Sequence, residues 1–270
     1  MRLTGRVLVI AGSDSGGGAG IQADIKTITA LGGYAATALT ALTAQDTRAV
    51  HAIHEVPAEF VKRQIEVVLA DIGADAIKIG MLHRAEAIAA VCEVLRGPAA
   101  KIPVVLDPVM AAKGGEALID AEATQALRRD LLNLTTLLTP NLPEAAALTL
   151  MPVVSLDDMV QAASLLLTFG PQAVLLKGGH LPGGTVYDVL VSPSGTEVMQ
   201  GPRIESLHTH GTGCTLASAI ATGLAQGLRL RDAVIRARAY VVEAIRTAPG
   251  YGKGHGPLNH AHTVGRYDGV

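Results

Sequence analysis

One segment of the chain, HGTGCTLASAI at residues 210–220, places a cysteine where a glycine-rich turn becomes a helical pattern. A helix that begins after Gly211, Thr212 and Gly213 leaves several backbone N–H groups unpaired, and these donors and the helix dipole together bind anions. The same field favours a thiolate, so we expect the pKa of Cys214 to lie below its ordinary value of about 8.5. The alternative for a lone cysteine is a small buried hydrophobic residue, which we expect for Cys92.

Five more polar clusters each follow a short apolar run. They are GSDSGGGAG at 12–20, TAQDT at 43–47, DP at 107–108, NLPE at 141–144 and KGGH at 177–180. Ligands of open parallel sheets bind outside the carboxyl ends of the strands. We therefore expect the five clusters to meet in one crevice.

Three of these clusters carry groups suited to phosphates and cations. Lys177 ends a buried strand and needs an anionic partner, for which a phosphate is our prediction. Asp107, with Asn141 and Glu144, supplies the sparse oxygen ligands that Mg²⁺ accepts while it keeps its waters and substrate phosphates. Taken alone, the N-x-x-E pattern is equally a common helix cap.

The first cluster is rich in glycine but lacks the Gly-Lys-Ser/Thr of a phosphate-binding P-loop, and it does not fit a dinucleotide fingerprint. It is either a flexible turn or a place where backbone approaches a ligand closely. Asp24, on the helix that follows, either reaches into the site or is an ordinary surface carboxylate. Glycine loops, carboxylates, a lysine and a helix start on one edge indicate phosphoryl transfer, which needs positioning and charge stabilisation.

Repeated strand–helix–strand order positions these groups. Apolar runs predict strands at 7–11, 34–42, 76–80, 104–107, 136–139 and 174–177, with a hairpin from 185–191 and 196–204. Helical patterns occupy 20–31, the residues after Pro57, 85–95, the residues from Thr212 and those from 232 to about 245. This order predicts an α/β fold with a parallel sheet covered on both faces. We expect a single domain over 1–270 and a glycine- and histidine-rich tail from 249 that crosses the surface.

Composition limits the classes of function. Hydrophobic residues make up 49% of the chain, charged residues 17% and aromatic residues 3%, and the net charge is −2. This balance excludes a disordered chain and provides no basic surface for nucleic acid. No uninterrupted apolar run approaches the roughly 20 residues of a membrane span. Two cysteines make no disulfide framework, so we expect a soluble protein of the cytoplasm.

The motifs together resemble a known family. AGSDSGGGAGIQAD, TAQDT, KIGML, VLDPVMAAKGG, LTPNLPEA, LLKGGH and HGTGCTLASAI occur in this order in the hydroxymethylpyrimidine/phosphomethylpyrimidine kinases of thiamine biosynthesis, which are ribokinase-like. The resemblance covers residues 6–245. It implies a three-layer α/β/α sandwich, a homodimer, and ATP- and Mg²⁺-dependent phosphorylation of 4-amino-5-hydroxymethyl-2-methylpyrimidine to its monophosphate and then its diphosphate.

The resemblance also implies a role for each motif residue. Residues 211–213 form the anion hole, Cys214 lies beside the acceptor hydroxyl as presumed base, and Lys177 neutralises ATP phosphates. Gln45 pairs with the aminopyrimidine, and Asp24, Met81 and Val109 line its pocket. Asn141 and Thr212 contact ATP, and Asp107 and Glu144 support Mg²⁺, with Asn141 assisting. Residues 111–115 resemble a mobile flap with Lys113 able to approach a phosphate.

Two alternatives stay open on the sequence. A related kinase that acts on pyridoxine or pyridoxal, alone or in addition, shares the cysteine; Gln45 with Met81 favours the aminopyrimidine. A non-catalytic binding protein would lose the anion hole, Cys214 or Lys177, and all are present here. Asp46 departs from the family, which more often has Asn after the glutamine, and an acid there is expected to alter hydrogen bonding near the substrate.

Overall fold

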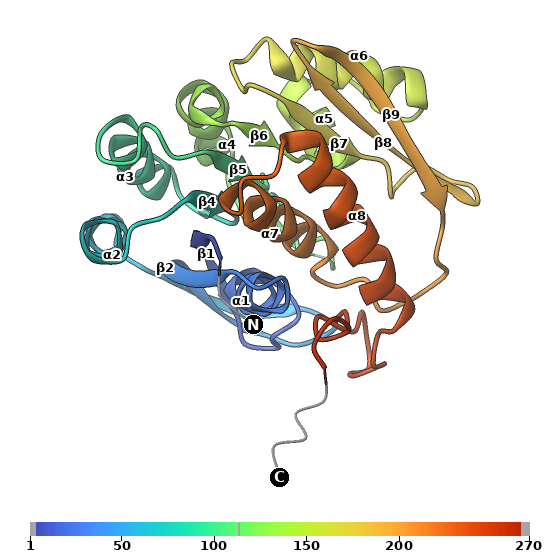
Figure 1. Ribbon diagram of the computed structural model, residues 1–270, viewed down its shortest axis with the longest axis horizontal. Coiled ribbons are helices and arrows are strands. Elements are labelled where there is room, and N and C mark those ends of the chain that lie inside the picture. The colour runs from blue at the N-terminus through green and yellow to red at the C-terminus, as the bar shows by residue number, and fades with distance from the viewer. Residues whose placement is uncertain (1–3, 113, 266–270) are drawn as a thin grey trace.

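The computed structural model describes residues 4–112 and 114–265, and these residues form one nine-stranded sheet (Figure 1). Its order is β3-β2-β1-β4-β5-β6-β7-β8-β9. The strands are β1 (Arg6–Asp14), β2 (Tyr34–Gln45), β3 (Val50–Glu55), β4 (Ala76–Ile79), β5 (Val104–Leu106), β6 (Leu137–Leu138), β7 (Val174–Lys177), β8 (Thr185–Ser192) and β9 (Gly195–Pro202). Strands β2, β1 and β4 to β7 are parallel, while β3, β8 and β9 are antiparallel additions at the two edges.

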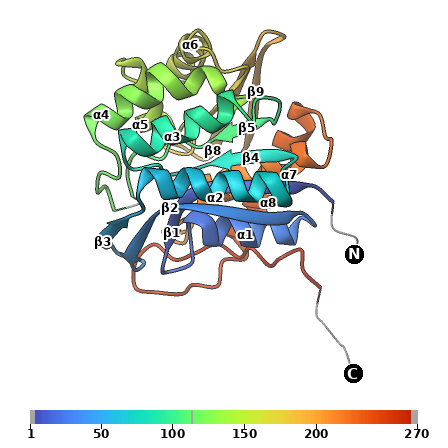
Figure 2. The ribbon, with the colours of Figure 1, turned by 90° about the vertical axis from the view of Figure 1, so that its left-hand side faces the viewer.

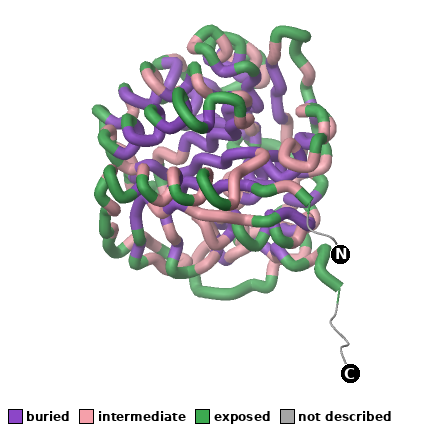
Figure 3. Tube along the Cα trace, turned by 60° about the vertical axis from the view of Figure 1, so that its left-hand side comes forward, coloured by how far each residue is buried: buried purple, intermediate pink, exposed green. Residues whose placement is uncertain are grey.

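Helices cover both faces of this sheet, which confirms the three-layer α/β/α fold (Figure 2). One face carries α1 (Gly20–Ala30), α7 (Thr212–Ala225) and α8 (Leu230–Arg246). The other face carries α2 (Ala58–Asp71), α3 (Ala85–Arg96), α4 (Ala121–Ala126), α5 (Leu142–Thr149) and α6 (Leu156–Leu167). Figure 3 shows the buried strands inside and the exposed chain around them.

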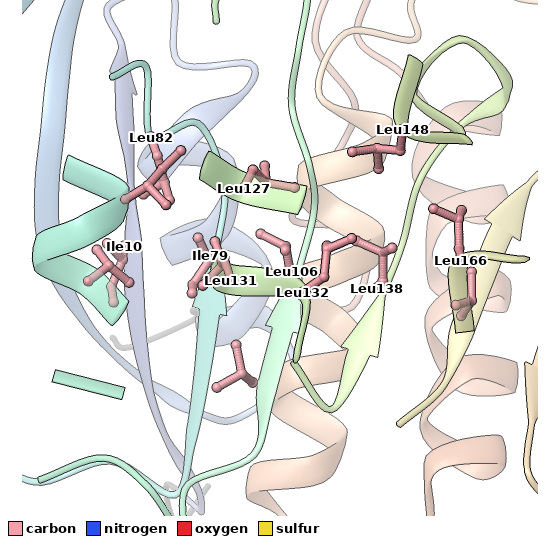
Figure 4. Packing of buried hydrophobic residues seen from close by; sticks show 14 of the residues in the cluster. Ile10, Ile79, Leu82, Leu106, Leu127, Leu131, Leu132, Leu138, Leu148 and Leu166 are labelled. Atoms are coloured by element: carbon pink, nitrogen blue, oxygen red, sulfur yellow. The ribbon is translucent and has the colours of Figure 1, made fainter. Parts of the chain in front are cut away.

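Side chains of the central strands alternate between two cores because successive residues of a strand point to opposite faces. In β1, Leu8 and Ile10 belong to the core under α2 to α6, whereas Val7 and Val9 belong to the core under α1, α7 and α8. Figure 4 shows Ile10, Ile79 and Leu106 of neighbouring strands packed in the first of these cores. Continuous apolar runs therefore form these strands, since both of their faces are buried.

The structure differs from the sequence expectation at two places that matter for the site. Strand β2 runs on to Gln45 and turns into β3, whose residues are mostly exposed and carry no apolar pattern. Strand β3 exists because β2 offers it a hydrogen-bonding edge. The expectation of a surface tail is also wrong in part, because Leu258 and His260 are buried.

Candidate active site

A cleft of about 870 Å³ lies at the carboxyl ends of the parallel strands. Its lining includes residues of all five polar clusters and of the start of α7: Gly12, Ser13, Asp14, Thr43, Gln45, Asp107, Asn141, Glu144, Lys177, Gly211, Thr212, Gly213 and Cys214. The expected convergence on one crevice is therefore confirmed. Lys113, expected on a flap beside this cleft, lies outside the described residues.

The start of α7 is the centre of the cleft. Gly211 has a φ of +83°, and a Cβ there would overlap the carbonyl oxygen of Gly18. A Cβ on Gly213 would lie 3.1 Å from Lys177 Nζ and 3.2 Å from Asp107 Oδ2. Within the described residues no side chain caps α7, although the Thr212 hydroxyl donates to Thr209 O at 2.7 Å. Glycines thus bring a helix start, rich in N–H donors, against the first polar loop and a charged pair.

The charged pair is Asp107 and Lys177, with Lys177 Nζ donating to Asp107 Oδ1 at 2.7 Å. Glu144 lies beside them, and burial raises its pKa to about 7; Lys177 opposes this shift and Asp107 adds to it. Asn141 and Glu144 also form the reciprocal helix cap, with Asn141 Oδ1 accepting from Glu144 N at 2.9 Å. The same two residues therefore start α5 and line the cleft.

Cys214 lines the cleft, but its pKa is not lowered as expected. Burial of the thiol raises the pKa of Cys214 to about 12, although the charge of Lys78 acts in the opposite direction. Burial removes water from the sulfur and disfavours the thiolate, an effect that the position at a helix start does not by itself reveal. The thiol of this structure therefore holds its proton at neutral pH.

Behind the cysteine is a fully buried ion pair. Lys78 Nζ lies 2.8 Å from Asp24 Oδ2, and Ser218 Oγ donates to Asp24 Oδ1 at 2.6 Å. Asp24, expected in the pocket lining, thus lies behind Lys78, since a buried carboxylate needs a cation and hydrogen bonds. Lys78 itself lines the cleft and was missed, although a lysine inside the apolar run AIKIG was a visible signal.

One end of the cleft is lined by Gln45, Met81 and Val109, as expected. Gln45 Oε1 accepts a hydrogen bond from Thr43 Oγ1 at 3.1 Å. Met81 packs closely against Gly12, since a Cβ on Gly12 would lie 2.5 Å from the methyl carbon of Met81. Asp46 turns away into the β2–β3 turn.

The Asp46 carboxylate accepts from the N–H groups of Arg48 and Ala49 at 2.7 and 3.0 Å. These bonds hold the pKa of Asp46 well below its usual range. Asp46 therefore stabilises the turn that follows Gln45.

A buried carboxylate organises the glycine loop, and sequence reasoning missed it. Asp14 accepts from the N–H groups of Gly16, Gly18 and Ala19, and from His210 Nε2 at 2.8 Å. Burial by itself raises the pKa of Asp14, but the bonds from His210 and the loop amides outweigh it and the pKa is lowered. The loop is therefore ordered around Asp14 and joined to the chain just before α7.

The part of the cleft at β8, α8 and the segment after β9 was also missed. It carries a cluster of apolar side chains, here called the apolar end, next to charged residues such as Arg203 and Arg238. Val186 of β8, Ile204 after β9, and Val241, Val242 and Ile245 of α8 line it. Nearby, Arg238 Nε donates to Asp188 Oδ2 at 2.7 Å and ties α8 to β8. No local motif marks this end, because it is assembled from three separate elements.

The three-layer fold and a cleft that joins a glycine helix start, a lysine and two carboxylates define a phosphotransferase of the ribokinase-like class. A family model described as phosphomethylpyrimidine kinase matches residues 14–259. The chain belongs to the phosphomethylpyrimidine kinase family.

Curated relatives and solved structures agree with this placement. The chain is 52% identical to the thiamine biosynthesis bifunctional protein ThiED of Geobacter sulfurreducens over 95% of its length, and spans about half of that protein. It is 48% identical to the hydroxymethylpyrimidine/phosphomethylpyrimidine kinase of Streptomyces coelicolor, covering 96% of this chain and 95% of the relative. An ADP complex of Bacillus subtilis pyridoxal kinase has a TM-score of 0.88 at 35% identity, and the match covers 96% of this chain and 98% of that one. Phosphomethylpyrimidine kinase of Clostridium difficile has a TM-score of 0.79 at 41% identity, and the match covers 89% of this chain and 99% of that one.

Proposed function

We propose that the protein uses ATP to phosphorylate 4-amino-5-hydroxymethyl-2-methylpyrimidine to its monophosphate and then to its diphosphate, in thiamine biosynthesis. The observation that carries this proposal is one continuous cleft with a polar end at Gln45, a helix start at its centre and an apolar end at α8. The near full-length similarity to a kinase named for both substrates supports the same reaction.

We assign the centre of the cleft to the transferred phosphate. Phosphoryl transfer passes through a loose transition state with charge on the peripheral oxygens, so catalysis is mainly positioning and electrostatic stabilisation. The N–H groups of residues 211–213 and the ammonium of Lys177 provide donors for that charge. We also assign Thr212, at the same helix start, a contact with the nucleotide phosphates.

We assign the polar end to the acceptor alcohol. The Gln45 amide supplies both a donor and an acceptor for an aminopyrimidine edge, while Met81 and Val109 pack against the ring. Cys214, the third residue of α7, contacts the acceptor hydroxyl in this assignment. Because its thiol is protonated at neutral pH, we propose that it orients the hydroxyl, and Asp24 acts from behind by holding Lys78.

The apolar end at α8 suits the base of ATP, with Asn141 on the path to the phosphates. The donor set also fits magnesium, because Asp107 and Glu144 both line the cleft beside Lys177. Mg²⁺ keeps several waters and binds largely through substrate phosphates, so it needs few protein ligands. The two carboxylates of Asp107 and Glu144 meet that need. Bound there, Mg²⁺ would neutralise phosphate charge.

A second candidate substrate is pyridoxal, favoured by the similarity to pyridoxal kinases of Bacillus subtilis and Staphylococcus aureus at 35% and 37% identity. The deciding experiment measures ADP release with Mg-ATP and each alcohol separately, and follows the phosphorylated products in time. We expect the pyrimidine monophosphate to appear first and the diphosphate to accumulate after it. Turnover of pyridoxal with none of the pyrimidine would overturn the primary proposal.

We also infer a cytoplasmic homodimer that acts on small molecules. Within residues 4–112 and 114–265, no helix has the length and apolar character needed to span a bilayer. Two free cysteines support a reducing compartment. Exposed apolar side chains at Leu42, Phe60 and Val67 support self-association, which light scattering on the purified protein would measure.

A further inference from the structure

The segment YGKGHGPLNH at residues 251–260, here called the C-terminal strap, belongs to none of the motifs used above. In Figure 2 the C-terminal chain, in red, runs beneath the blue strands toward β3. In the part of the chain that the structure describes, the cleft lining includes no strap residue. The strap nevertheless contacts three segments that carry cleft residues.

The first contact is with Thr47, two residues after Gln45. Thr47 Oγ1 accepts from the N–H groups of Lys253 and Gly254, both at 3.1 Å, and Thr47 O accepts from His255 N at 2.8 Å. A Cβ on Gly254 would overlap the Thr47 carbonyl oxygen. Glycine is therefore required there for the strap to lie against the turn that follows Gln45.

The second contact is with the chain that leads into α7. Gly256 O accepts from His210 N at 3.2 Å, and a Cβ on Gly256 would overlap the His208 ring. His255 Nδ1 lies 3.1 Å from Leu207 O. The strap thus supports the backbone of His210, whose side chain holds the Asp14 loop.

The third contact is with α7 itself. His260 is buried, and its Nε2 lies 2.9 Å from Oγ1 of Thr215, the residue after Cys214. The hydroxyl of Tyr240 on α8 donates to His260 O at 2.5 Å and fixes this end of the strap. One short segment therefore joins the turn after Gln45 to the helix that presents Cys214.

We propose that the C-terminal strap is a positioning element of the acceptor site, with Thr47 and Gly254 as its main positioning residues. It holds Gln45 and Cys214 at a set separation, so it acts on the alcohol through residues that touch it. This inference rests on the assignment of the polar end to the acceptor. The strap meets α8 at Asn259 and His260, whereas Lys253, Gly254 and His255 hold the turn that follows Gln45. Changes at Thr47 or Gly254 should therefore act on the acceptor and not on ATP.

The test uses Thr47→Val, which removes the hydroxyl acceptor at nearly constant size, and Gly254→Ala, which forces the strap off the turn. Gly265→Ala is the control, because a Cβ there meets nothing within 4 Å. We expect KM for the alcohol to rise about threefold to tenfold in Thr47→Val, the factor set by a hydrogen bond of ordinary strength. A larger rise is expected in Gly254→Ala, with KM for ATP unchanged in both.

A purely structural strap would lower the melting temperature and leave the KM for the alcohol unchanged, and this result in Thr47→Val overturns the proposal. An equal rise in KM for both substrates overturns it as well. If Gly254→Ala does not fold, Thr47→Val decides alone. Wild-type turnover in the same assay separates this test from the proposed function: should pyridoxal be the alcohol turned over, the variants are compared with that alcohol.

Discussion

Replacing Gly213 with alanine separates the catalytic use of the α7 start from its structural use. Gly213 is the second residue of α7 and has no positive φ, so alanine is compatible with its backbone. Alanine is favoured over glycine in helices by up to about 1 kcal/mol, which opposes the cost of crowding the neighbouring side chains. The new Cβ, however, would lie 3.1 Å from Lys177 Nζ and 3.2 Å from Asp107 Oδ2, in the space assigned to the phosphate.

We therefore expect a large loss of kcat with little change in stability. Removing one donor from an oxyanion site costs about 100-fold to 1,000-fold in kcat, or roughly 3 to 4 kcal/mol, and a methyl group that displaces the phosphate should cost a similar amount. The assay is ADP release at saturating substrates, together with the melting temperature. Gly184→Ala, where a Cβ meets nothing within 4 Å, is the control. A kcat close to wild type in Gly213→Ala would refute the assignment of the α7 start to the phosphate.

Three further predictions concern Cys214, Lys78 and Asp14. Cys214→Ala should lower the rate of the first phosphoryl transfer about 100-fold, as expected for a misplaced acceptor, and the rate of the second transfer less. Near-wild-type rates in Cys214→Ser would favour a role for Cys214 in orienting the hydroxyl. Rates as low as in Cys214→Ala would favour a role as general base. Lys78→Met leaves the Asp24 charge buried without its partner and should lower the free energy of unfolding, measured in urea, by about 3 to 5 kcal/mol. Adding Asp24→Leu should recover most of this loss. The pKa of Asp14 is lowered on folding, so its carboxylate stabilises the fold above pH 4 and this stability is lost as the pH falls below about 4. Asp14→Asn should remove that part of the pH dependence of unfolding; an unchanged pH profile would contradict it.

The parts of the site that sequence reasoning anticipated are those with a local signal. Asp107 and Lys177 each stand at the end of an apolar run, and parallel strands bring such ends to one edge. The glycines before Cys214 likewise indicate a helix start from neighbouring residues alone. Strand β3 had no such signal, because its residues are mostly exposed and only the edge of β2 makes them a strand.

By itself, the sequence determined the α/β order, the strand ends that form the cleft and the glycine turn that opens α7. The tertiary structure alone decided which distant groups meet: His210 binds Asp14 across 196 positions, and the strap reaches Thr47 from the far end of the chain. It also decided the pKa of Cys214, which burial raises by more than the charge of Lys78 lowers it. The physical reason is that strand ends follow from neighbouring residues, whereas pairing and desolvation depend on what packing brings into contact.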